Sequence, residues 1–136
     1  MSSYVRALVA VSVLIVEKNK VLALKRSEHS DAAAGKWETI SGRVQVKESL
    51  LEAARREAFE ETALHVELEE RPLLSYLAKR AEQDMVVVVY RGRVVSGEIA
   101  ISEEHSEFRW VDLDGFSKLC EFDQLVEAVG LALSAP

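Results

Sequence analysis

The sequence has little cysteine, proline and glycine, and each shortage excludes a class of protein. Its 136 residues include one cysteine, Cys120, two prolines and six glycines. A single cysteine excludes an internal disulfide framework and a cysteine-based zinc cage, and it fits a reducing compartment. Because 49% of the residues are hydrophobic, the composition is neither that of a disordered chain nor that of collagen. We expect one domain over residues 1–136 that buries a core without covalent cross-links.

The sequence also lacks a long apolar run and an excess of positive charge. The apolar stretch Ala7–Val16 spans ten residues, about half of what a membrane-spanning helix needs. A signal peptide is the alternative for this stretch, but no small-residue cleavage site follows it. The net charge of −6 argues against broad binding to nucleic acid or an anionic membrane. We therefore expect a cytoplasmic protein with no nucleic-acid or membrane partner, in which a bound anion requires a basic cluster or a metal ion.

Hydrophobic patterning predicts an α/β protein with a mixed β-sheet. The apolar run 4–16 is continuous rather than alternating, which is typical of a strand buried on both faces. Further extended segments are expected at 21–25, 37–46 (with a break at Ser41-Gly42), 64–68, 73–79, 85–95 and 108–111. Helices are expected at 48–61, 113–119 and 122–133, and a polar loop is expected at 27–36. Strands with one central helix and helices at the C-terminal end predict an α/β sandwich.

The helix expected at 48–61 carries three glutamates on one flank. On a helical wheel the apolar residues form a core-facing stripe, and Glu61 falls inside that sector, beside Glu57 and Glu60. Like charges at this spacing repel, and a carboxylate turned toward the core is costly unless it is neutralised, paired or bound to a metal. The alternative is a solvated acidic face paired with the arginines of the helix. Oxygen donors clustered in this way suit Mg²⁺ or Mn²⁺.

The stretch from Gly42 to Leu64 resembles the Nudix box. That pattern is Gly, five residues, Glu, seven residues, and then Arg-Glu-apolar-x-Glu-Glu-x-Gly-apolar. The fixed positions that match are Gly42, Glu48, Arg56, Glu57, Glu60, Glu61 and Leu64. Two other segments are similar to parts of Nudix proteins, namely Gly35-Lys36-Trp37-Glu38 and Glu104-His105-x-Glu107-x-x-Trp110-Val111. The resemblance therefore covers about residues 5–120.

The chain departs from the Nudix pattern in the loops around the box. Ala63 stands where the family has glycine, Ser41 replaces the first glycine of a usual pair, and Ile40 replaces a common proline. Position 63 follows the end of the helix, where a positive φ is favoured. Alanine there is expected to cost about 1 kcal/mol or to shift the cap. None of the departures removes a carboxylate of the box.

The resemblance implies a fold, an activity and a cofactor. The implied fold is a Nudix-like α/β/α sandwich with a mixed β-sheet, and the implied activity is hydrolysis of a diphosphate linkage in a nucleoside diphosphate derivative. The implied cofactor is Mg²⁺ or Mn²⁺, held by Glu57, Glu60, Glu61 and the carbonyl oxygen of Gly42. Such an ion neutralises phosphate charge and acidifies a bound water. Arg56 is implied to pair with a carboxylate of the box and to fix its side chain.

Several roles stay open at this point. The general base is Glu57, Glu104 or Glu107, with Glu104 placed in a loop that can reach the metal site. Glu48 is expected to cap or orient the helix of the box. Two loop histidines, His29 and His105, are expected to have no ligand role. Two tryptophans, Trp37 and Trp110, are expected to pack at strand edges. Three basic residues near the expected cleft can contact phosphates: Arg26, Lys36 and Arg43.

The substrate is not determined by the sequence. Arg80 stands where an ADP-ribose type would have a proline, and Tyr76 and Tyr90 are misplaced for a diadenosine-polyphosphate type. A small nucleotide such as a nucleoside triphosphate is the expected substrate, and a homodimer is common in similar proteins. The alternative function is a Nudix-fold module that binds a nucleotide without hydrolysing it. The altered residues Ser41 and Ala63 favour this alternative, whereas the intact carboxylates argue against it.

Overall fold

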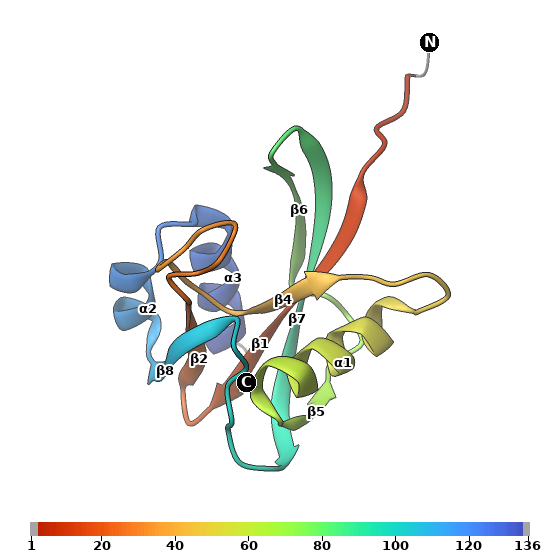
Figure 1. Ribbon diagram of the computed structural model, residues 1–136. Helices are drawn as coiled ribbons and strands as arrows, with labels where there is room; N and C mark the ends of the chain where they lie inside the picture. The colour runs from red at the N-terminus through yellow and green to blue at the C-terminus, as the bar shows by residue number, and fades with distance from the viewer. Residues whose placement is uncertain (1–2, 135–136) are drawn as a thin grey trace.

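The computed structural model describes residues 3–134, which form eight strands and three helices (Figure 1). The strands are β1 (Leu8–Glu17), β2 (Lys20–Arg26), β3 (Trp37–Glu38), β4 (Ile40–Arg43), β5 (His65–Leu68), β6 (Leu74–Arg80), β7 (Gln83–Ser96) and β8 (His105–Val111). The helices are α1 (Leu50–Thr62), α2 (Leu113–Leu119) and α3 (Asp123–Ser134). None of the helices in this described part is long and apolar enough to cross a membrane.

The sheet is mixed, as the sequence predicts, with its one parallel pair at the centre. Strands β1 and β7 run parallel from the Leu8–Met85 pair to the Ile15–Gly92 pair. The other strand pairs are antiparallel, with β2 and β4 on β1, β5 and β6 on β7, and β3 and β8 on β2. The two-residue turn between β1 and β2 has positive φ at Lys18 and Asn19, which is typical of a tight hairpin.

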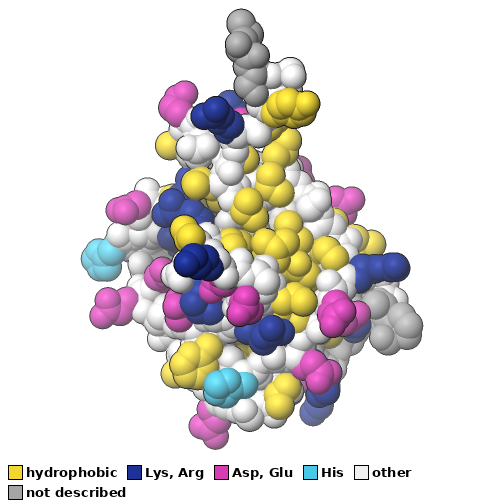
Figure 2. Space-filling view, turned by 90° about the vertical axis from the view of Figure 1, so that its right-hand side faces the viewer, with side chains coloured by type: hydrophobic (Ala, Val, Ile, Leu, Met, Phe, Trp, Pro, Cys, Tyr) yellow, Lys and Arg dark blue, Asp and Glu magenta, His cyan; other side chains and the backbone are white. Residues whose placement is uncertain are grey.

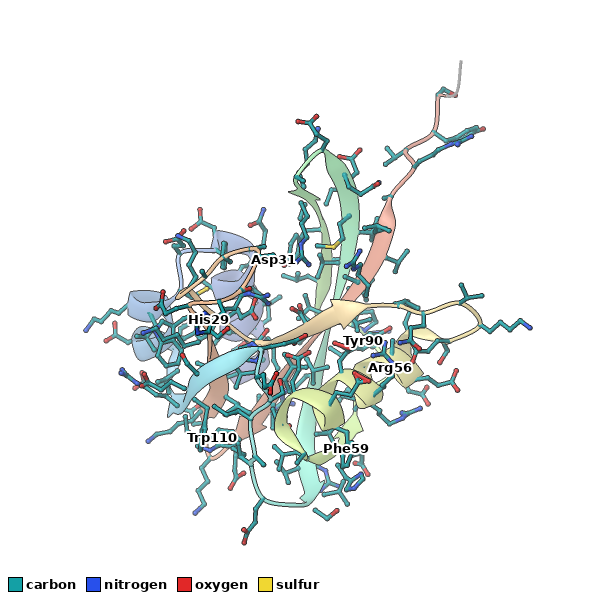
Figure 3. The ribbon with its side chains drawn as sticks, in the orientation of Figure 1. His29, Asp31, Arg56, Phe59, Tyr90 and Trp110 are labelled. Carbon is teal, nitrogen blue, oxygen red and sulfur yellow. The ribbon has the colours of Figure 1, made fainter. Side chains whose placement is uncertain are left out.

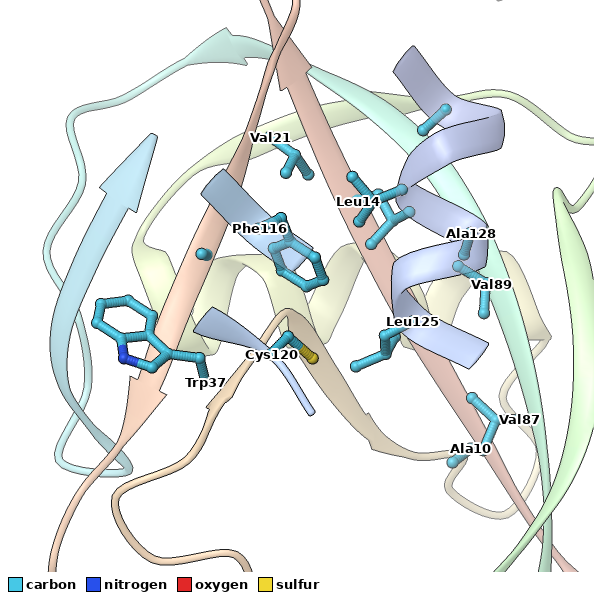
Figure 4. Packing of buried hydrophobic residues seen from close by; sticks show 13 residues of the cluster. Ala10, Leu14, Val21, Trp37, Val87, Val89, Phe116, Cys120, Leu125 and Ala128 are labelled. Atoms are coloured by element: carbon cyan, nitrogen blue, oxygen red, sulfur yellow. The ribbon is translucent and has the colours of Figure 1, made fainter. Parts of the chain in front are cut away.

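Two hydrophobic clusters lie on opposite faces of the sheet and form two layers of core. On one face α2 and α3 pack through Phe116 and Leu125 against Leu14 of β1 (Figure 4). On the other face α1 packs through a row of alanines against Val13 and Ile15 of the same strand. Successive side chains of a strand point to opposite faces, so β1 serves both layers. The prediction of a first strand buried on both faces is thus confirmed for its central residues.

Helix α1 leaves part of its own face of the sheet uncovered. Leu77 of β6 and Val9 of β1 both pair with Val86 of β7, so the three side chains lie on one face. Leu77 and Val9 remain 61% and 39% exposed. Hydrophobic side chains gather on the side of the molecule shown in Figure 2.

Several expected boundaries differ from the structure by a few residues. The first strand begins at Leu8 rather than at residue 4, because residues 3–6 are exposed. The break in the segment 37–46 falls at Thr39, and Ser41-Gly42 lies inside β4, where Gly42 pairs with Val11 of β1. The last strand begins at His105, because its register with β2 extends to Arg26.

The ends of α1 determine how its glutamates face the sheet. Ser49 is the N-cap, and its side chain and that of Glu52 form a reciprocal capping box. Of the two roles expected for Glu48, capping or orienting the helix, capping is wrong by one residue. At the other end Ala63 adopts φ +63°, and its N–H donates to the carbonyl oxygen of Phe59. The cap has not shifted, so the alanine bears the conformational cost of the left-handed conformation.

Candidate active site

Glu61 is a buried carboxylate that is poorly satisfied. Its last-turn position on α1 turns it toward β4, and it is only 2% exposed. The backbone N–H of Ser41 donates to Glu61 Oε1 across a long 3.4 Å, and Glu61 Oε2 has no hydrogen-bond partner within residues 3–134. Burial, together with the nearby carboxylates of Glu57 and Glu104, raises the pKa of Glu61 far above its usual range. The wheel-based prediction that Glu61 faces the core is confirmed.

Glu57 lies one helical turn before Glu61 and rests against the backbone of Gly42. A Cβ atom on Gly42 would stand 1.7 Å from Glu57 Oε2, so no side chain larger than hydrogen fits there with Glu57 in this position. Arg56 Nη1 donates to Glu57 Oε1 across 2.5 Å. The Glu57 side chain is 12% exposed, and Arg56 holds one of its two oxygens.

Arg56 extends from α1 toward the end of β4 and acts as a clamp (Figure 3). Its Nε and Nη2 donate to the two carboxylate oxygens of Glu48 across 2.6 and 3.0 Å. Its Nη2 also donates to the carbonyl oxygen of Arg43, and its Nη1 donates to Glu60 Oε2 across 3.2 Å. The guanidinium lowers the pKa of Glu48. The expected pairing of Arg56 with carboxylates of the box is present, and Glu48 acts by orienting this arginine.

The loop before β8 brings a third carboxylate to the same place. One potential ligand atom from each of Glu61, Glu104 and His105 lies within 4.8 Å of the others. The loop is fixed to α1, because the backbone N–H of Ser102 donates to the carbonyl oxygen of Glu61. It is also fixed to β2, because the N–H of Ser27 donates to the carbonyl oxygen of Glu104. We call Glu57, Glu61 and Glu104 the carboxylate cluster.

His105 is buried at the start of β8, and the expectation that it lies in a polar loop is wrong. The side chain has no exposed surface. Its Nε2 lies 2.9 Å from Glu38 Oε2, while its Nδ1 lies 4.0 Å from Glu61 Oε1 and has no hydrogen-bond partner among the described residues. Arg26 Nη1 donates to the same Glu38 oxygen across 3.1 Å. The sequence reasoning missed Glu38 and His105 as site residues, although both lie in the segments that resemble Nudix proteins.

Other candidates lie at the edge of the site or away from it. The Glu60 side chain is 53% exposed and faces Arg56, and Glu107 pairs with Arg109 on β8. Lys36 pairs with Glu121. Three further candidates are an exposed loop histidine, a buried tryptophan beneath Arg109 and a half-buried tryptophan that packs on the α1-side core: His29, Trp37 and Trp110. The expectation that the tryptophans serve in packing is confirmed.

A cleft of about 540 Å³ opens beside the carboxylate cluster. Gly42, Glu57 and Glu104 line one part of it. The other part has apolar walls from β6, β7 and the N-terminal end of α3, contributed by Tyr76, Met85, Val87, Phe122 and Leu125. The amide of Gln124 also lines the cleft. The cleft therefore joins a strongly acidic end to an apolar end, and its size is ordinary for a small-molecule site.

The fold and this acidic site define the class to which the chain belongs. The sequence model of the NUDIX domain matches residues 6–127, and the chain belongs to this family. The MutT protein from Methanosarcina mazei Go1 is similar in structure, with a TM-score of 0.81 and 29% sequence identity. The alignment covers 95% of this chain and 94% of that one. The Nudix-like α/β/α sandwich expected from the sequence is confirmed.

Two curated relatives act on nucleotides by name. The bis(5'-nucleosyl)-tetraphosphatase [asymmetrical] of Rattus norvegicus is 31% identical over 94 residues, which are 65% of this chain. The oxidized purine nucleoside triphosphate hydrolase of Danio rerio is 33% identical over 103 residues, which are 75% of this chain. The matched region spans 64% of the length of each relative.

Proposed function

We propose that this chain is a divalent-metal-dependent hydrolase that cleaves a diphosphate linkage in a nucleoside diphosphate derivative, with a nucleoside triphosphate as its substrate. The observation that carries the proposal is the orphaned Oε2 of Glu61. A buried carboxylate oxygen without a partner, next to two further carboxylates, is destabilising unless a cation or a proton compensates it. A cation bound at Glu61 would compensate this carboxylate.

The residues present fit Mg²⁺ or Mn²⁺. Both ions prefer oxygen donors and bind through a few carboxylates together with substrate phosphates. We assign Glu57, Glu61 and the carbonyl oxygen of Gly42 as ligands, and Glu60 as a further ligand that must first leave Arg56. When bound, the ion neutralises phosphate charge and acidifies a water.

The roles of the remaining residues follow from their contacts. Arg56 holds one oxygen of Glu57 and leaves the other toward Gly42, so it fixes the orientation of that carboxylate. Glu104 is exposed, lines the cleft and lies beside Glu61. These features support Glu104 as the general base that takes the proton of the attacking water. Glu107 has no such position, and Glu57 is the second candidate.

The character of the cleft is consistent with a substrate that consists of a single nucleoside and its phosphates. Its apolar walls suit a base, and its acidic end suits phosphates only when a cation is bound. Arg43 and Arg80 line the cleft and have no ion-pair partner within the described part of the chain, so both side chains are available to phosphate oxygens. Of the two curated relatives, the oxidized purine nucleoside triphosphate hydrolase agrees with this class by its name, whereas the bis(5'-nucleosyl)-tetraphosphatase is named for a substrate with two nucleosides.

The test is to incubate the protein with Mg²⁺ and a panel of nucleoside triphosphates, nucleoside diphosphate derivatives and dinucleoside polyphosphates. Chromatography would follow nucleoside monophosphate and pyrophosphate as products. We expect hydrolysis of at least one nucleoside triphosphate, its loss in EDTA, and its loss in Glu61→Gln. Binding of nucleotides in Mg²⁺ without any product would contradict the proposal and support the binding module instead.

A further inference from the structure

His105 is a buried polar side chain to which the proposed reaction assigns no role. Its ring lies between two carboxylates, with Nε2 at 2.9 Å from Glu38 Oε2 and Nδ1 at 4.0 Å from Glu61 Oε1. Nδ1 has no hydrogen-bond partner within residues 3–134, and the same is true of Glu61 Oε2. The nitrogen nearest to Glu61 is thus a buried polar atom without a partner, and such an atom calls for an explanation.

From this geometry we infer that His105 is a positioning residue that orients the carboxylate of Glu61 for metal binding. The inference rests on the proposed function, because it concerns one of the proposed ligands. The Nδ1–Oε1 separation is about 1 Å longer than a hydrogen bond, so a small rotation of either side chain closes the contact. A ring that carries a proton on Nδ1 donates a hydrogen bond to the ionised carboxylate that binds the metal. A neutral ring with its proton on Nε2 only accepts at Nδ1, so it bonds to Glu61 only while that carboxyl group is protonated.

The other side of the ring is held in place by Arg26 and Glu38. Arg26 pairs with Glu38, and its Nε donates to Ser30 Oγ across 2.9 Å and to the carbonyl oxygen of Ala32 across 2.8 Å. An ionised carboxylate only accepts hydrogen bonds, so Nε2 of His105 is the donor to Glu38. The chain Arg26–Glu38–His105 therefore fixes the ring and leaves Nδ1 directed at Glu61.

His105 acts through Glu61 rather than as a ligand itself. Its ring is fully buried, and its Nε2 is already held by Glu38. Mg²⁺ prefers oxygen ligands over imidazole nitrogen. Groups that hydrogen-bond to a metal ligand change metal affinity by about 10–100-fold when they are mutated.

Two substitutions of His105 distinguish a role in orienting Glu61 from a role in packing alone. The amide of His105→Asn reaches the place of Nδ1 and can still bond to Glu61, whereas that of His105→Gln reaches the place of Nε2 and can bond only to Glu38. Each variant loses one contact, and the shorter asparagine opens the larger gap, so a packing role alone would make His105→Asn the weaker binder. We expect His105→Gln to weaken Mn²⁺ binding by about 10–100-fold, and His105→Asn to retain most of the affinity.

The measurement is the Mn²⁺ dissociation constant of the full chain from the electron paramagnetic resonance signal of free Mn²⁺, with melting temperatures in EDTA alongside. His29→Gln, a change at an exposed histidine, is the matched control and should bind as the wild type does. If the His105 variants do not fold, the test uses Glu38→Gln, which opens no gap, can still accept from Nε2 and loses the ion pair with Arg26 that holds this side chain. It should weaken Mn²⁺ binding in the same assay by less than the loss of about 10–100-fold expected for His105→Gln.

Three results would overturn the inference. The first is unchanged Mn²⁺ affinity in His105→Gln, or in Glu38→Gln where that variant replaces it. The second is an equal loss in His105→Asn and His105→Gln, and the third is pulsed-resonance coupling of the bound Mn²⁺ to an imidazole nitrogen. Glu61→Gln serves as the reference. If Mn²⁺ affinity is also unchanged in Glu61→Gln, the proposed metal site itself fails, and that outcome is distinct from failure of the role of His105 alone.

Discussion

Replacing Glu61 with glutamine should make the metal-free protein more stable. The Glu61 carboxylate is 2% exposed, its Oε2 has no hydrogen-bond partner in the described part of the chain, and burial raises its pKa far above the ordinary value of 4.5. In EDTA the folded protein therefore keeps a proton on Glu61 that the unfolded chain releases at neutral pH. Glutamine has nearly the same shape and does not ionise.

The size of the effect follows from linkage between proton binding and folding. One pKa unit corresponds to about 1.4 kcal/mol, and a pH of about 7.5 lies about three units above the pKa of an unfolded glutamate, which gives an upper limit of about 4 kcal/mol. Movement of neighbouring side chains and entry of water reduce this penalty, and we expect a gain of about 1–3 kcal/mol. Because the folded state binds the extra proton, wild-type stability falls as the pH rises from about 5 to 8.

Thermal unfolding in EDTA, followed by circular dichroism across this pH range, tests the prediction. Glu61→Gln should melt at least about 3 °C above the wild type near pH 7.5, and the difference should shrink toward pH 5. Millimolar Mg²⁺ should raise the melting temperature of the wild type more than that of the variant, because the ion binds the folded state. A variant that is less stable than the wild type in EDTA, or a difference that does not change with pH, would refute the reasoning.

Three further predictions concern the cleft and the helix end. Glu104→Gln should lower kcat about 100-fold or more with little change in KM, with a deficit that shrinks at high pH, while Glu107→Gln stays mild; steady-state kinetics that show the reverse order would assign the base elsewhere. Gly42→Ala should lower kcat about 100-fold, because the new Cβ would stand 1.7 Å from Glu57 Oε2 and displace that carboxylate; near-normal turnover would contradict this. Ala63→Gly should raise the free energy of unfolding in urea by about 1 kcal/mol, because φ is +63° at this position; a loss of stability would show that the cap is not strained.

The sequence predicted most of the fold and the part of the site that lies on α1. Local composition and periodicity predicted three elements correctly. They are the strand around Leu14, the strand around Val87 and the helix that contains Glu57 and Glu61. The spacing of the box placed Glu61 on the buried side of α1, since residues on one helix face are fixed by the helical repeat. Only the boundaries differed, where cap geometry and strand pairing decide the end of an element.

The tertiary structure decided how distant side chains meet the helix, although the family resemblance had put Glu104 forward. Glu104 and His105 come to α1 only because β8 pairs with β2 and the preceding loop bonds to the end of α1. Glu38 becomes the partner of His105 through the pairing of β3 with β2. A polar residue that is buried and one that is exposed look alike in a sequence, because burial of a side chain depends on non-local packing. The sequence by itself thus determined the helix and its carboxylates, and the packing of the sheet determined what surrounds them.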